Sequence, residues 1–121
     1  MRIKVVAESQ DDFNKWIKSQ EEITSSLKDS MAFKGSEIFQ TKTCADCHSI
    51  SGTPANASVG PNLTHFASRQ TILSGMMKNN DQNLKRWLTD PQKIKQGAHM
   101  PNFILTKKEV NELAEYLEGL K

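Results

Sequence analysis

The strongest constraint on this 121-residue chain is the segment Cys-Ala-Asp-Cys-His at positions 44–48. It contains the only two cysteines of the sequence, three positions apart, and a histidine directly follows the second one. Cys-x-x-Cys-His is the attachment pattern of c-type haem. Two thiols on one helical turn can each add to a vinyl group of a porphyrin, and the adjacent imidazole then points at the iron. We therefore predict that Cys44 and Cys47 bind haem c covalently and that His48 ligates its iron.

Other interpretations of the cysteine pair account for less of the sequence. A structural zinc ion needs about four ligands, usually including a second Cys or His pair, whereas His65 and His99 are isolated. A thioredoxin-type redox site lies at the strand-to-helix junction of a βαβ unit, and the sequence predicts no such unit. A plain disulfide would explain neither His48 nor the thin apolar core.

The composition also favours a buried cofactor. A chain of this length has room for one small core, yet only 36% of its residues are hydrophobic and 7% aromatic. The predicted helices are short and are joined by loops of about ten residues, so they bury little surface against one another. A large flat apolar group would give them a surface to pack on.

The charge pattern argues against nucleic-acid binding. Residues 1–30 hold five basic and six acidic side chains, and residues 31–121 hold eleven and eight. The excess of basic over acidic side chains in residues 31–121 is mild, and it lacks the dense basic stripe that is typical of nucleic-acid binders. These basic side chains form either a solvated face or a surface that steers an acidic partner.

No stretch approaches the ~20 apolar residues of a membrane span. The first apolar run ends at Glu8, so we expect any export signal to lie outside this chain.

Hydrophobic periodicity predicts an all-α domain with almost no strand after residue 8. Thr106 and Glu109 form a capping box at the start of the last helix, and Pro91 is expected to end the helix before it. The segments 50–58 and 60–62 have the composition of loops. The predicted helices of this domain cover residues 30–43, 68–77, 82–90 and 106–117.

The first thirty residues differ from the rest. Residues 2–7 show a strand pattern, and the polar segment 9–12 followed by Phe13, Trp16 and Ile17 predicts a capped, one-sided helix. About twenty residues cannot fold alone. The polar stretch that follows reads as a linker, with its boundary near Asp29. We divide the chain into residues 1–20, a linker at 21–30 and a domain at 31–121.

An electron-transfer haem also needs an axial ligand on its opposite face, from a later segment. We choose Met100, because Pro101 stiffens its loop and biases it away from helix. Met76 and Met77 lie at helical core spacing, which favours packing. Histidines 65 and 99 are more often surface or hydrogen-bonded residues than ligands. The candidates for this ligand are His65, Met76, Met77, His99 and Met100.

Residues 31–121 resemble a class I monohaem cytochrome c domain. The matching features, besides the haem motif, are Gly-Pro-Asn-Leu at 60–63, Asn-Leu-Lys-Arg-Trp-Leu at 83–88 followed by Asp-Pro, and Met-Pro at 100–101 before a terminal helix. The resemblance implies about four helices around one covalent haem. It implies that Pro61 supports the His48 side and that Trp87 lies near a haem propionate, although Trp87 is equally consistent with an ordinary core tryptophan. The first and last helices of the domain would cross at Gly35, Phe39, Leu113 and Tyr116.

Residues 1–20 resemble a different protein segment, the end of the copper domain of cytochrome c oxidase subunit II, with its last strand and the helix after it. In that family a methionine at the position of Met1 closes a binuclear copper site. The cysteines, histidines and carboxylate that should precede it are absent, so we expect no copper in this chain, and Met1 is equally consistent with an initiator. Together the two parts resemble the caa-type oxidases, as the C-terminal piece of subunit II.

These resemblances imply one-electron transfer by a c-type haem, from an upstream donor to the copper centre of the oxidase in aerobic respiration. This domain would make or break no substrate bond, although the whole oxidase is an oxidoreductase. The expected partners are the remainder of subunit II, subunit I and a donor protein, at the extracytoplasmic face of the membrane. One alternative is a free soluble cytochrome c, which leaves residues 1–20 unexplained. Another alternative is a haem peroxidase or a gas sensor, which needs an open sixth coordination position on the haem iron.

Overall fold

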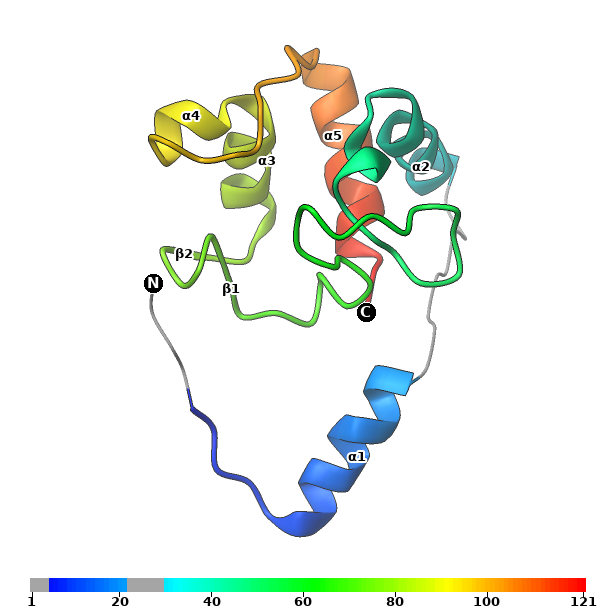
Figure 1. The fold of residues 1–121 in the computed structure, drawn as a ribbon, viewed down its shortest axis with the longest axis vertical. Helices are drawn as coiled ribbons and strands as arrows, with labels where there is room; N and C mark the ends of the chain where they lie inside the picture. Colours follow the sequence, from blue (N-terminus) through cyan, green and yellow to red (C-terminus); the bar gives the residue numbers. More distant parts are fainter. Residues whose placement is uncertain (1–4, 22–29) are drawn as a thin grey trace.

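The computed structural model describes residues 5–21 and 30–121 (Figure 1). The fold is mostly helical, with one very small sheet. No helix in these two ranges is long and apolar enough to cross a membrane. In chain order the elements are α1 (Gln10–Glu21), α2 (Ser30–Thr41), the 3₁₀-helix η1 (Cys44–Asp46), β1 (Thr71–Ile72), β2 (Met77–Lys78), α3 (Asp81–Thr89), α4 (Pro91–Ile94) and α5 (Lys107–Glu118).

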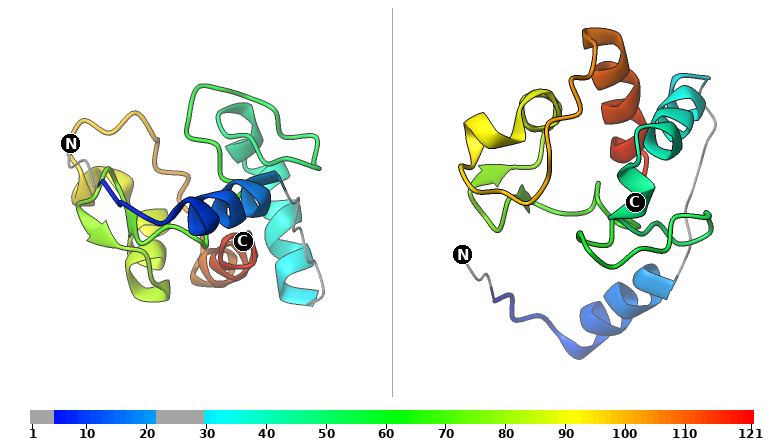
Figure 2. Two further views of the ribbon diagram at one scale, coloured as in Figure 1. Left: turned by 90° about the horizontal axis from the view of Figure 1, so that it is seen from below. Right: turned by 45° about the horizontal axis from the view of Figure 1, so that its top comes forward.

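Helices α2 and α5 lie side by side, as the views in Figure 2 show, and they pack against each other. The close approach depends on Gly35, where a Cβ would overlap the carbonyl oxygen of Glu112 and lie 2.5 Å from the Cβ of Tyr116. Phe39 meets the Tyr116 ring edge to face, with centroids 5.9 Å apart. Leu113 of α5 is 1% exposed. The expected crossing of the first and last helices of the domain is confirmed.

Helix α3 packs its apolar face against α5. Leu84 and Leu88 are buried, as the spacing of its hydrophobic residues predicts. The side chain of Asn80 caps this helix by accepting a hydrogen bond from the backbone N–H of Asn83 at 2.9 Å. The helix ends at Thr89, close to the predicted end.

Pro91 has a second role that the sequence analysis did not assign. It is the first residue of α4, where a missing N–H costs nothing because that N–H has no helical partner. Asp90 caps this short helix by accepting from the N–H of Lys93 at 3.1 Å. The proline therefore both follows α3 and starts α4.

The prediction of a helix at 68–77 is wrong, because residues 71–78 form an antiparallel hairpin. Ile72 pairs with Met77, and the turn between them contains Leu73 and Ser74 in left-handed conformation, with φ of 55° and 58°. Gly75 has φ 86° and completes the turn. Met76 lies in this turn and is 54% exposed, and Met77 packs half-buried against the core.

Side-chain hydrogen bonds from outside the hairpin explain why the turn prevails over the helical pattern. The amide of Asn79 donates to the carbonyl oxygen of Phe66 at 2.8 Å and to that of Arg69 at 3.0 Å. The backbone N–H of Asn79 also donates to the carbonyl of Gln70 at 3.0 Å. These bonds bring the two ends of the segment together, which a helix could not do.

Helix α1 is confirmed near its predicted bounds. The Ser9 hydroxyl accepts from the N–H of Asp12 at 3.2 Å and so caps the helix. Phe13 and Trp16 stack with centroids 5.8 Å apart, and both remain about half exposed. Residues 5–7 form no strand, and the rest of the predicted strand, with Met1, lies outside the described residues, as do most of the linker and the boundary near Asp29.

The capping box of α5 is confirmed. The Thr106 hydroxyl accepts from the N–H of Glu109 at 3.2 Å, and a Glu109 carboxylate oxygen accepts from the N–H of Thr106 at 2.8 Å. The other oxygen forms an ion pair with Lys42 at 3.0 Å. The hydrogen bond from Thr106, followed by that from Lys42, lowers the pKa of Glu109 from 4.5 to about 2.

We expect Gly35→Ala to destabilise the protein by about 2 kcal/mol, because the added methyl group overlaps α5 backbone and forces α2 away. In a helix with no close neighbour, the same substitution would instead raise the free energy of unfolding by ~1 kcal/mol, because alanine has the higher helix propensity. Denaturant unfolding measures the difference. Lys34→Ala, on the exposed neighbouring position, is the control and should stay within about 0.5 kcal/mol of the parent. A Gly35→Ala protein as stable as the parent would contradict the close crossing.

We also expect Glu109 to contribute acid-sensitive stability. Since its folded pKa lies below the unfolded value of 4.5, the contribution is fully present above that pH and is lost as the pH falls towards 2. Glu109→Gln should therefore have a lower denaturant midpoint of unfolding than the parent at pH 6. Near pH 2 the midpoints of the two proteins should become similar. Glu115→Gln, on the exposed side of α5, is the control. An equal effect of Glu109→Gln at both pH values would be the contrary result.

Candidate haem-binding site

The cysteine segment forms one tight hydrogen-bonded turn after α2. Thr43 has φ 61°, in the left-handed region, and this turns the chain out of the helix into η1. The carbonyl oxygen of Cys44 accepts from the N–H of Cys47 at 3.1 Å and from that of His48 at 2.9 Å. All three motif residues thus belong to a single turn, as the predicted attachment chemistry requires.

The two cysteine side chains lie in this turn without a bond to each other. Cys44 is buried and Cys47 half-buried, and no disulfide joins them. Burial raises the pKa of the Cys44 thiol from 9.0 to about 11, so it is neutral at physiological pH. Within the described ranges, no group of three or more His, Cys, Asp or Glu side chains could hold a metal ion.

The imidazole of His48 is held by the backbone of the segment 60–61. Its Nδ1 lies 2.8 Å from the carbonyl oxygen of Pro61. Since a carbonyl oxygen only accepts hydrogen bonds, Nδ1 carries the proton, and Nε2 of the neutral ring keeps the lone pair that a metal needs. The ring also lies against Gly60, where a Cβ would be 2.6 Å from Cε1. The N–H of Gly60 donates to the carbonyl of Cys47 at 2.6 Å, which folds this segment back onto the motif.

Met100 lies in the connection between α4 and α5, outside any helix or strand, as expected. Its side chain is half-buried against the core, whereas neighbouring His99 is exposed. The Gln92 side chain donates to the carbonyl oxygens of Ala98 at 2.7 Å and Met100 at 2.9 Å. These bonds hold the backbone from Ala98 to Met100. Iron ligation by Met100 stays a prediction.

The other ligand candidates are placed differently. Nε2 of His65 lies 3.1 Å from the carbonyl oxygen of Gln20 at the end of α1 and donates to it.

Trp87 is half-buried and packs against the core from α3. This position agrees with the core interpretation of the tryptophan, and its contact with a haem propionate stays a prediction.

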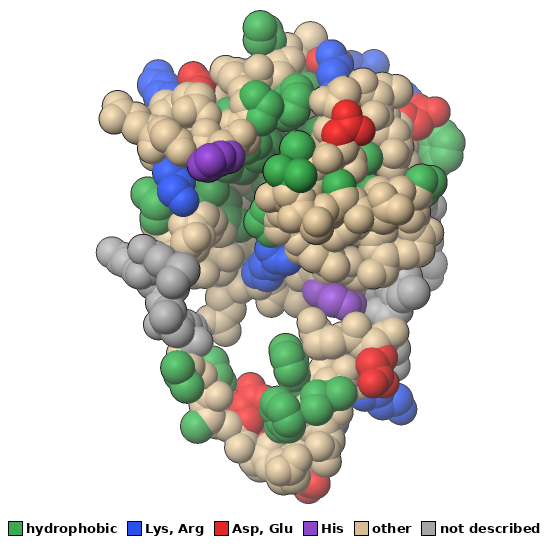
Figure 3. Space-filling view, in the orientation of Figure 1, with side chains coloured by type: hydrophobic (Ala, Val, Ile, Leu, Met, Phe, Trp, Pro, Cys, Tyr) green, Lys and Arg blue, Asp and Glu red, His purple; other side chains and the backbone are tan. Residues whose placement is uncertain are grey.

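The surroundings of these residues fit a flat apolar group. Figure 3 shows hydrophobic side chains gathered in a hollow between the part that carries α3 and α4 and the part that carries the cysteine turn. Several apolar side chains on the edge of the core are only partly buried by protein. With two free thiols, an imidazole with an available Nε2 and a thioether in a loop, the donor set suits a covalent haem. The partly buried side chains are Ile38, Ala45, Leu73, Met77, Trp87, Met100 and Leu105.

Three contacts of the site were not foreseen from the sequence. The packing of His48 on Gly60 could have been suspected only because this glycine directly precedes Pro61. Gln92 carries no sequence signal for its bonds to the Met100 loop. Glu109 was recognised as a helix cap, but its ion pair with Lys42 joins residues far apart in the chain.

The chain matches known proteins in two ways. A family model described as cytochrome c matches residues 32–121. Over its whole length the chain is similar to cytochrome c oxidase subunit 2 of Bacillus subtilis (36% identity), of Bacillus sp. strain PS3 (34%) and of Alkalihalophilus pseudofirmus (31%). The chain spans 35% of the length of each of these relatives.

We expect Gly60→Ala to displace the His48 ring, because the new methyl group would lie between 2.6 and 3.1 Å from three of its atoms. The variant should mature with less attached haem and lose about 1–3 kcal/mol of stability. Absorbance of the purified protein and denaturant unfolding measure the two effects. Val59→Ala is the control, because Val59 is 80% exposed and directly precedes the glycine. Equal haem content in the two variants would contradict the proposed packing.

Proposed function

The chain belongs to the cytochrome c family, and on this premise we propose that residues 31–121 form an electron-transfer domain with one haem c. Cys44 and Cys47 would attach it through thioether bonds, and His48 and Met100 would ligate its iron. The observation that carries the proposal is the turn of two free thiols with His48, whose Nε2 is made available by the bond from Nδ1 to Pro61.

The residues around this site have separable roles. When bound, the haem iron supplies one-electron chemistry by alternating between its ferrous and ferric states. Gly60 and Pro61 orient the imidazole and hold its proton on Nδ1. A methionine sulfur and apolar surroundings both favour the less charged ferrous state, which raises the potential. Gln92 holds the backbone of the loop that carries Met100.

We further propose that the chain is the cytochrome c part of an oxidase subunit II. The family model begins at residue 32, whereas similarity to the three oxidase subunits extends over the whole chain. Residues 1–31 are therefore shared with oxidase subunits rather than with cytochrome c domains in general. In this proposal residues 1–20 end the copper domain, residues 21–30 link it to the cytochrome c domain, and no copper binds to this chain. A free soluble carrier would leave this N-terminal similarity unexplained.

The oxidase context supplies the partners. Electrons would arrive from an upstream donor and leave to the copper centre of the same subunit, close to subunit I. A short linker raises the effective concentration of one redox centre near the other. Because haem c is attached outside the cytoplasm, we place the domain at the extracytoplasmic face of the membrane.

Met100→Ala tests the site and the function together. We expect the haem to stay covalently attached, as an intact mass of chain plus haem, while the reduction potential falls by on the order of 100 mV. Carbon monoxide should then bind the ferrous protein at neutral pH, because the sixth position is open. Redox titration and absorption spectra measure both changes.

Met76→Ala is the matched control for this experiment. Met76 is 54% exposed in the hairpin turn, so its removal should leave the potential and the spectrum unchanged. An unchanged potential in Met100→Ala would exclude Met100 as the ligand. A parent protein whose mass equals the bare chain after maturation in its native host, or one that binds carbon monoxide readily, would exclude the electron-transfer proposal.

A further inference from the structure

The loop after Met100 contains one residue, Ile104, that has a strained backbone and an exposed side chain. Ile104 has φ 50°, an unfavourable left-handed conformation for a β-branched residue, and its side chain is 86% exposed. The side chain of Asn102 stabilises this turn by accepting from the N–H of Ile104 at 2.9 Å. Burial of Ile104 does not offset this strain, so other contacts must hold the loop. These are the partial burial of Met100 and Leu105 against the core and the bonds at the two ends of the loop.

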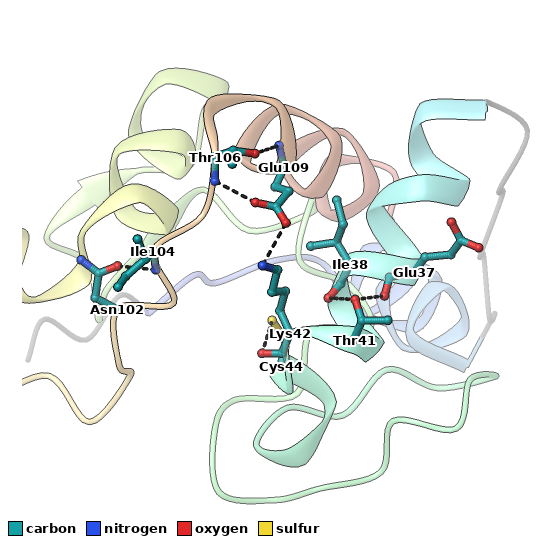
Figure 4. Close-up of polar contacts among 9 residues, drawn as sticks. All are labelled: Glu37, Ile38, Thr41, Lys42, Cys44, Asn102, Ile104, Thr106 and Glu109. Atoms are coloured by element: carbon teal, nitrogen blue, oxygen red, sulfur yellow. Dashed lines mark hydrogen bonds and ion pairs between the residues drawn. The ribbon is translucent and has the colours of Figure 1, made fainter.

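At the N-terminal end of this loop, the Gln92 side chain donates hydrogen bonds to the loop backbone. At the C-terminal end, the loop is bound by the carboxylate of Glu109. One oxygen accepts from the N–H of Thr106, where the loop enters α5, at 2.8 Å. The other oxygen accepts from Nζ of Lys42 at 3.0 Å (Figure 4). A single carboxylate therefore joins the end of the Met100 loop to the segment before the cysteine turn.

Lys42 connects this carboxylate directly to the haem-attachment turn. It lies two residues before Cys44, whose Sγ is 3.9 Å from the carbonyl oxygen of Lys42. The side chains of Lys42 and Glu109 are 37% and 22% exposed. Isolated surface ion pairs contribute little because both side chains must be ordered. Here the bond from Thr106 already orients the carboxylate, so the pair with Lys42 loses less conformational freedom when it forms.

We propose that Lys42 and Glu109 are positioning residues for the sixth ligand, which keep the Met100 loop closed against the cysteine turn. The inference rests on the proposed function, in which Met100 ligates the iron. The side chains of Lys42 and Glu109 make no bond to a cysteine thiol, since only the backbone carbonyl of Lys42 contacts Cys44. Loss of their ion pair should therefore release the methionine more often while the haem stays attached. Opening of the loop, rather than attachment of the haem, is the property that this pair controls.

A purely structural role, in which Glu109 only caps α5, predicts a different ranking of variants. Lys42→Gln removes the ion pair and leaves both bonds of the capping box. Thr106→Ala removes the capping hydroxyl but leaves the backbone N–H that binds Glu109 and the pair with Lys42. The positioning role predicts the larger effect on the loop for Lys42→Gln, and the cap-only role predicts it for Thr106→Ala.

The experiment uses the ferric, haem-loaded chain and imidazole as the probe. Imidazole can replace the Met100 sulfur only when the loop opens, and loss of the sulfur-to-iron charge-transfer absorption reports the exchange. We expect Lys42→Gln and Glu109→Gln each to accelerate this exchange by about three- to tenfold. The double variant should be no faster than the faster single variant, since both changes break the same contact.

Lys85→Gln is the matched control. It removes the same charge and breaks an ion pair of similar kind, with Asp81 on α3 at 2.5 Å, away from the loop. If Lys42→Gln exchanges no faster than Lys85→Gln, or no faster than Thr106→Ala, the positioning role is overturned. If the parent protein itself lacks the sulfur-to-iron absorption, Met100 is not the ligand, and both this inference and the assignment of the sixth ligand fall.

Discussion

The close crossing of α2 and α5 positions both segments that carry the candidate haem ligands. Gly35 leaves no side chain between the two helices, so Phe39 can meet Tyr116 and both backbones come into contact. Helix α2 leads directly into the cysteine turn, and α5 directly follows the Met100 loop. The crossing therefore sets where the two halves of the haem site lie relative to each other, and it brings Lys42 within reach of Glu109.

The orientation of His48 depends on backbone groups rather than on charged side chains. The loop between 49 and 63 folds back on itself, with the N–H of Ile50 bound to the carbonyl of Ala55 at 3.0 Å and that of Leu63 to the carbonyl of Ser49 at 2.8 Å. This brings Gly60 and Pro61 against the imidazole. A carbonyl acceptor holds the proton on Nδ1 without adding a charge to the candidate site.

Local signals predicted most of the helices, and a non-local contact explains the main error. The capping box of α5 and the apolar face of α3 involve residues three or four positions apart, so a sequence window contains all that determines them. The spacing of Ile72, Leu73 and Met76 also fits a helix. The hairpin prevails because Gly75 takes a left-handed conformation and Asn79 binds carbonyl groups across the segment. Those partners are recognisable only once the chain has folded.

The sequence alone predicted a covalent haem and the cytochrome c family, because the spacing of two cysteines and a histidine is a local pattern. It also pointed to Met100, through the proline that keeps this residue out of a helix. The folded structure was needed to show which nitrogen of His48 is available, which amide holds the Met100 loop, and which carboxylate faces Lys42. These contacts join segments far apart in the chain, and their geometry follows from how closely two helices approach rather than from any local pattern.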